Sequence, residues 1–184
     1  AFRLDDGTYM YVQPLENHAA LDVNLWKEVE DKIGEDAFGE LMSGFNGTYL
    51  SHRDYIVQFD SAKSFMMDDL SVDDVYREWY FQYVYQEKMD DYMNILDDWK
   101  KALTDVNSPM GYGVYFAGLG MDGPVCVYML WGENNVETIE KNNKTTELME
   151  GKRQELWQKT KKFIHKIEIK RGSLMEDLTY MPTN

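Results

Sequence analysis

The stretch GYGVYFAGLGMDGPVCVYMLWG, residues 111–132, decides the fold that the sequence predicts. Two apolar segments, 112–119 and 125–131, flank the turn-forming residues Gly120–Gly123, which is typical of a β-hairpin. Side chains alternate between the two faces of a strand, yet here large apolar residues occupy both sets of positions. A strand that is apolar on both faces is covered on both faces. The hairpin therefore predicts a covering layer on each side.

The segments around the hairpin predict a repeating order of elements. An aromatic strand at 79–85 precedes an amphipathic helix over 89–103, whose opposite faces are apolar and acidic. The hairpin follows, then a helical region over about 136–163 that Gly151 interrupts. A last strand contains Ile167 and Ile169. The order is β-α-β-β-α-β, the split βαβ or ferredoxin-like plait.

The first part of the chain predicts a shorter version of the same order. Strand-like residues at 9–13 precede helical spacing over 21–33, and a second hairpin is expected from 45–50 and 55–59. Only about twenty residues then remain before Trp79, too few for another helix and strand. The first copy is therefore truncated. We divide the chain into a ferredoxin-like half at 1–70 and another at 71–184, together forming one compact unit.

These predictions combine into a fold class, α+β. In a single plait the helices cover one face of the sheet, and the other face stays open. Because the hairpin is apolar on both faces, a second sheet is the expected cover for the open one. We expect two tandem ferredoxin-like plaits (βαββαβ, the first copy truncated) that pack sheet to sheet as a pseudo-dimeric α/β barrel.

A family resemblance agrees with this arrangement. The aromatic strand, the acidic amphipathic helix, the hairpin GVYFAGLGMDGPVCVYMLWG and the closing DLTYMP resemble the dimeric α/β barrel (ferredoxin-like) superfamily, as a tandem fusion in one chain. That superfamily includes antibiotic-biosynthesis monooxygenase-like and NIPSNAP-like proteins. The resemblance covers most of the chain as a pattern of elements. Its members include cofactor-independent monooxygenases, haem-degrading enzymes and proteins without known activity, so it leaves the function open.

Composition excludes several classes of partner. The formal charge is −14, whereas nucleic acids and anionic membranes require a basic patch on the protein, so neither is expected to bind. The cluster of Lys and Arg at 152–171 is interleaved with Glu and apolar residues, which indicates a solvated helix face. The chain starts at Ala1 without Met, which fits both an exported, periplasmic protein that has lost a signal peptide and a trimmed cytoplasmic one. A homodimer is compatible with the resemblance.

No motif indicates a cofactor or a metal ion. His18, His52 and His165 do not lie at ligand spacing from one another, and the adjacent pairs of Asp do not match a calcium-binding loop. Cys126, the single cysteine, lies in an apolar strand and is interpreted as a buried hydrophobic residue. We therefore expect no metal and no cofactor.

The aromatic strands carry the candidate site. Tyr and Trp need hydrogen-bond partners when buried, and these strands contain more of them than a packed core requires. We expect Tyr83, Tyr112, Phe116 and Trp131 to line a pocket between the sheets, with Arg53 as a cation at its rim. Of the hairpin's two faces, the one with Tyr112, Val114 and Phe116 is favoured as the lining over the one with Tyr115 and Leu119.

Three functions stay open. The first is a non-catalytic small-molecule-binding protein with the ligand between the sheets, which the absence of an acid–base constellation favours. The second is a cofactor-independent monooxygenase-like enzyme acting on a small aromatic or electron-rich substrate. The third is a structural or interaction protein with a filled barrel.

Overall fold

The computed structural model describes residues 1–24 and 26–178, which form two compact units. The larger unit contains residues 1–11 and everything described from 55 onward, and the smaller contains 12–54. Leu25 of the predicted first helix and Thr179–Pro182 of the DLTYMP stretch lie outside the described residues. In the described part of the chain, no helix is long and apolar enough to cross a membrane.

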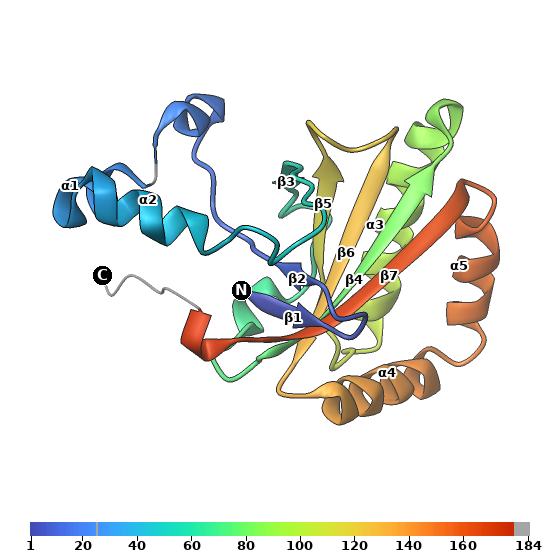
Figure 1. Cartoon of the computed structure of the whole chain (residues 1–184). Helices are drawn as coiled ribbons and strands as arrows, with labels where there is room; N and C mark the ends of the chain where they lie inside the picture. The colour runs from blue at the N-terminus through green and yellow to red at the C-terminus, as the bar shows by residue number, and fades with distance from the viewer. Residues whose placement is uncertain (25, 179–184) are drawn as a thin grey trace. The chain divides into compact units, whose positions relative to one another are not determined.

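One antiparallel sheet forms the larger unit, with its described strands in the spatial order β2-β1-β7-β4-β6-β5-β3 (Figure 1). The strands are β1 (Phe2–Leu4), β2 (Tyr9–Met10), β3 (Val57–Phe59), β4 (Tyr76–Val84), β5 (Gly113–Ala117), β6 (Val125–Gly132) and β7 (Ile164–Leu174). β4 lies at the centre, paired with β6 on one side and β7 on the other. The short strands β2 and β3 form the two edges.

The order of elements from β4 to β7 is the predicted one. After β4 come α3 (Met89–Asp105), the hairpin of β5 and β6, the helices α4 (Asn135–Met149) and α5 (Lys152–Thr160), and then β7. The predicted break at Gly151 is confirmed, because α4 ends at Met149 and α5 begins at Lys152. α3 ends at Asp105, and Asn107, two residues later, has a positive φ of 48° that takes the chain out of helical geometry.

The helices α3, α4 and α5 lie on one face of the sheet, here called the helix face, and the opposite face is called the open face (Figure 1). Apolar side chains of these helices pack against the helix face. Leu96 of α3 and Leu156 of α5 are fully buried in this layer, beside Val114 and Cys126 of the hairpin. Burial of one such leucine contributes about 1.5–3 kcal/mol. The helix face therefore contains the larger part of the core.

Two edges of the same sheet contribute to the cover of the open face. Its buried residues include Trp79 and Phe81 of β4, against which Phe2 from one edge and Tyr55 from the other pack as T-shaped ring pairs. The Tyr55 hydroxyl donates to the Met10 sulfur at 3.9 Å, so residues next to β3 and in β2 meet. Both faces of the hairpin are therefore at least partly buried: the helices cover one face, and residues from the curled sheet edges pack on the other.

The second sheet expected from the tandem arrangement is not formed. All strands found in residues 1–24 and 26–178 belong to the single sheet, and the N-terminal part contributes only its edge strands β1, β2 and β3. The predicted strand at 45–50 consists of turns and irregular chain, and the one at 9–13 is reduced to Tyr9–Met10. The coarse class, α+β, is confirmed, with a curled antiparallel sheet. The expected packing of two sheets against each other was wrong, because the described strands form one sheet.

The smaller unit is helical. It contains the 3-10 helix η1 (His18–Asp22) and the helices α1 (Lys27–Ile33) and α2 (Glu35–Ser43), separated by Gly34 with a φ of 86°. The expected helix over 21–33 is thus split, and α2 was not predicted. None of its described residues is buried, although the Trp26 and Phe38 rings lie 6.4 Å apart.

Candidate functional site

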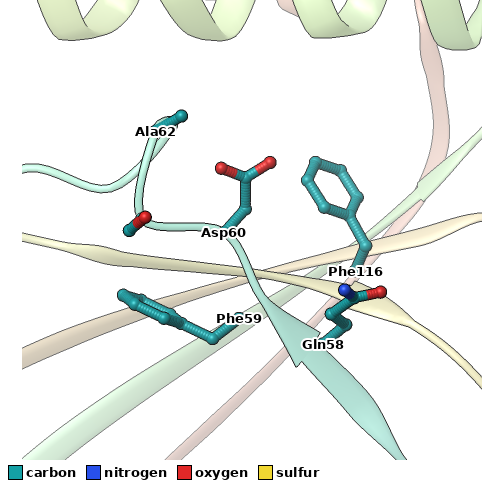
Figure 2. Close-up of a pocket in the computed structure, with 6 residues that line it drawn as sticks. Gln58, Phe59, Asp60, Ala62 and Phe116 are labelled. Atoms are coloured by element: carbon teal, nitrogen blue, oxygen red, sulfur yellow. The ribbon is translucent and has the colours of Figure 1, made fainter.

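A pocket of about 310 Å³ lies beside β3 and β5 (Figure 2). Phe116, on β5, is the predicted site residue that lines it. The other lining residues come from β3 and the turn after it: Gln58, Phe59, Asp60, Ser61 and Ala62. The pocket therefore lies at an edge of the sheet, where β3 gives way to a turn.

The turn over residues 60–64 is held rigidly against β5. The Asp60 N–H donates to the Val114 carbonyl at 2.9 Å. The buried Ser64 hydroxyl donates to the Asp60 carbonyl at 2.6 Å and accepts from the Val114 N–H at 2.9 Å. Because buried hydrogen bonds of this kind fix both partners, this wall of the pocket is preorganised.

Two lysines tie the same turn to α3. The Lys63 ammonium donates to the Met93 carbonyl at 3.2 Å and to the Asp97 carboxylate at 2.7 Å. The Lys100 ammonium donates to the Ala62 carbonyl at 2.8 Å. The pocket thus has supports on both the sheet and the helix layer.

The pocket combines aromatic surface with one carboxylate. Figure 2 shows the Asp60 carboxylate and the Phe116 ring pointing to the same side of the strands, while the Phe59 ring points elsewhere. One Asp60 oxygen, Oδ1, accepts the Lys63 N–H at 3.0 Å. The Phe59 ring lies 5.3 Å from the Tyr115 ring, which restricts its motion. Such a surface can hold a small organic molecule by its apolar part and orient it by a polar group.

The hairpin face that was favoured as the lining is the one that the helices cover, and Phe116 is its member that borders the pocket. Tyr112, Val114 and Phe116 point to the helix face, where Tyr112 lies 5.5 Å from Tyr128 and 6.1 Å from Phe65 between ring centres. Burial raises the pKa of Tyr112 well above its ordinary value, and its hydroxyl finds no hydrogen-bond partner in the described part of the chain. Tyr112 is therefore part of the helix-face core, while Tyr115 packs on the open face.

Tyr83 and Trp131 occupy the open face. The Tyr83 hydroxyl donates to Glu168 at 3.2 Å, and the Lys166 ammonium lies 4.5 Å above its ring. Trp131 is buried, with its indole lying tightly over Gly111: a Cβ atom there would be 2.6 Å from the ring. Trp131 is thus packed against its neighbours.

Arg53 belongs to the smaller unit. It is exposed and lies in irregular chain, because the hairpin whose turn it was predicted to occupy is not formed. The predicted site residues are therefore divided among the helix face, the open face and the smaller unit.

A buried charged centre on the helix face was missed by the sequence analysis. The Glu78 carboxylate accepts from the Tyr76 hydroxyl at 3.2 Å, from Arg171 Nε at 3.0 Å and from the Tyr80 hydroxyl. Burial, followed by the charge of Glu78, raises the pKa of Tyr76; burial and then the hydrogen bond to Glu78 raise the pKa of Tyr80 to about 12. Groups with perturbed pKa values concentrate at functional sites. The available signal was the charged residue Glu78 beside the aromatic run Trp79–Phe81 of the same strand.

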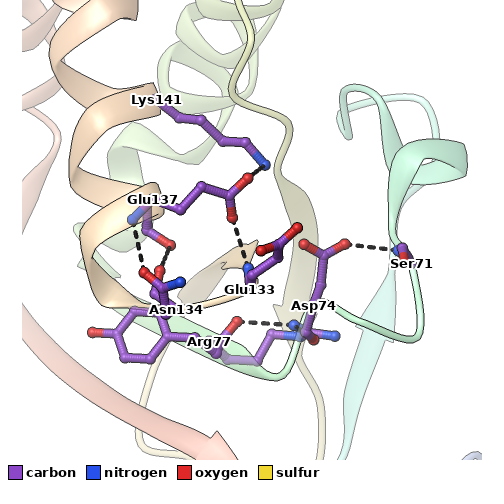
Figure 3. Close-up of polar contacts among 9 residues, drawn as sticks. Ser71, Asp74, Arg77, Glu133, Asn134, Glu137 and Lys141 are labelled. Atoms are coloured by element: carbon purple, nitrogen blue, oxygen red, sulfur yellow. Dashed lines mark hydrogen bonds and ion pairs between the residues drawn. The ribbon is translucent and has the colours of Figure 1, made fainter.

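A second polar group surrounds the start of α4 (Figure 3). The Asn134 side chain accepts the Glu137 N–H at 3.0 Å, and the Glu137 carboxylate accepts the Glu133 N–H at 2.7 Å. A Glu137–Lys141 ion pair at 2.7 Å completes it. This is a helix N-cap with its capping partners, which accounts for these residues structurally.

His18 and His52 belong to the smaller unit, and His165 belongs to the larger one. His52 Nε2 lies 2.9 Å from the Asp54 carboxylate, and the His165 ring lies 5.1 Å from the Tyr85 ring. Among residues 1–24 and 26–178, no group of three or more His, Cys, Asp or Glu side chains is arranged to hold a metal ion.

Comparisons with known proteins identify no family for this chain. No protein-family model matches the chain. No curated protein matches it either. A solved structure described as an anthrone oxidase-like protein is similar, with a TM-score of 0.46 and 9% identity, over 82% of this chain and 67% of that one.

Proposed function

We propose that this protein binds a small organic ligand in the pocket beside β3 and β5. The observation that carries the proposal is the preorganised turn over residues 60–64, which holds the Asp60 carboxylate next to the Phe116 ring without help from a ligand. A volume of about 310 Å³ suits a molecule of one or two rings.

Binding is favoured over catalysis by the composition of the pocket. Asp60 is the one titratable residue among the described residues that line it, so the acid–base pair that an oxygenase-like reaction uses has no counterpart there. The order of elements from β4 to β7 supports a relationship to the ferredoxin-like α/β barrel proteins, but it favours no particular reaction.

A pocket-filling substitution tests the proposal. A fragment library is screened by ligand-observed NMR against the unmodified protein and against Ala62→Trp, which places an indole in the pocket from an exposed position. We expect fragments that bind the unmodified protein and are lost in the variant. The matched control is Ala19→Trp, the same change at an exposed position of η1. Binding that survives Ala62→Trp, or no binding to the unmodified protein, would refute the proposal.

A further inference from the structure

One strip of β7 on the helix face is left partly uncovered by the helices. Ile167, Ile169 and Arg171 alternate along β7 and stand opposite Gln82, Tyr80 and Glu78 of β4. The isoleucines keep 36% and 44% of their surface exposed, and the Arg171 side chain keeps 40%. Two exposed isoleucines next to an arginine form a small amphipathic surface.

The buried Glu78 carboxylate holds Arg171 in place. Its Nε donates to the Glu78 carboxylate at 3.0 Å, and Glu78 is itself buried, with 8% of its side chain exposed. The hydroxyls of Tyr76 and Tyr80 donate to the same carboxylate and fix its position. A guanidinium anchored through Nε presents its outer end in one orientation, which lowers the entropic cost of binding a second anion.

The charges of this surface favour an anion over a cation. The Glu78 carboxylate already accepts from three donors and is buried, so it is not accessible to a cationic ligand. Arg3, on the same face of β1, adds positive charge, and Asp5, whose N–H donates to the Arg171 carbonyl, adds one negative charge, while the Arg153 guanidinium is taken up by hydrogen bonds to Asn142 and Thr146. The charged group that a ligand meets on this strip is therefore the exposed outer end of Arg171.

We propose that Ile167, Ile169 and Arg171 bind a small organic acid, with its carboxylate on the outer guanidinium of Arg171 and its apolar body over the two isoleucines. This surface is separate from the pocket beside β3, so the proposal stands apart from the proposed function.

Titration with a carboxylate and its uncharged and cationic analogues tests the inference. Benzoate, benzamide and benzylamine are each added to the ¹⁵N-labelled protein at low salt and neutral pH. We expect saturable benzoate shifts centred on residues 167–171, with benzamide and benzylamine at least fivefold weaker. Arg171→Gln should weaken benzoate binding at least fivefold.

The matched control is Lys170→Gln, which removes the same charge from the adjacent residue. Lys170 stands opposite Trp79 and therefore points to the open face. It should change the affinity less than twofold. Equal losses in the two variants would mean that benzoate responds only to overall charge, and benzylamine binding as strongly as benzoate would exclude an anion site. If Arg171→Gln fails to fold, the benzoate shifts of the unmodified protein test the inference by themselves. Shifts centred away from residues 167–171, or only at the pocket beside β3, would overturn it.

Discussion

Trp99 of α3 links α3 to α5 within the helix layer, and its replacement should be costly. It packs in the helix-face core, and its indole N–H donates to the Thr160 hydroxyl of α5 at 2.9 Å. Large-to-small changes of a buried aromatic cost about 3–5 kcal/mol. Trp99 is partly exposed, which lowers the packing loss, and the hydrogen bond adds about 1 kcal/mol. We expect Trp99→Ala to lower the free energy of unfolding by about 3–4 kcal/mol.

Urea unfolding followed by far-UV circular dichroism measures this loss. The control is Asp98→Ala, on the exposed side of the same helix, with an expected change within about 0.5 kcal/mol. Asp97, the other outward-facing acid, is unsuitable as a control because it pairs with Lys63. A double-mutant cycle of Trp99→Phe with Thr160→Val should give a coupling of about 0.5–1.5 kcal/mol. Similar losses for Trp99→Ala and Asp98→Ala would refute the assigned orientation of α3.

Three further predictions concern reactivity, packing and pH. Burial raises the pKa of Cys126 to about 12, so its thiol should not react with a disulfide reagent at pH 8 until urea unfolds the protein; reaction in the folded state would contradict this. Gly172→Ala should lower the free energy of unfolding by about 1–3 kcal/mol, because its Cβ would lie 2.4 Å from the Arg3 carbonyl, whereas Gly151→Ala meets no atom within 4 Å and should not destabilise in urea titrations. The pKa of Tyr80 is about 12 against an ordinary 10.0, so the folded state keeps a proton that the unfolded state loses. Stability should be full below pH 10 and fall between pH 10 and 12, and Tyr80→Phe should flatten that fall in urea midpoints; an unchanged slope would exclude Tyr80 as its source.

Local patterns predicted the part of the chain between β4 and β7 well. The apolar spacing of α3 and the turn at Gly120–Gly123 are signals contained in short segments, and both are present. The strand expected at 45–50 is not formed, which shows the limit of such local signals. Phe45, Tyr49 and Leu50 resemble strand residues, but no partner strand pairs with them and all three are exposed. Strand propensity without a partner does not make a sheet.

The candidate site depended on contacts that no local pattern contains. Alternation divided the hairpin into two sets of side chains, but which set the helices cover is decided by how α3 crosses the sheet. The pocket beside β3 exists because Ser64 bonds to Val114, fifty residues further along the chain. The Glu78 centre could have been predicted from the sequence, because a carboxylate next to aromatic strand residues must find hydrogen-bond partners when it is buried.

The pairing of β1 with β7 joins the first described strand to the last. During synthesis on the ribosome, β1 emerges before the other described strands, and beyond its short pairing with β2 it has no partner until residues 172–174 are made. The sheet from β4 to β6, with α3 against it, can form earlier, because its contacts span shorter stretches of chain. Until β7 is made, nothing joins β1 to the centre of the sheet, and we expect this to be the period in which the chain is most open to chaperone binding or misassembly.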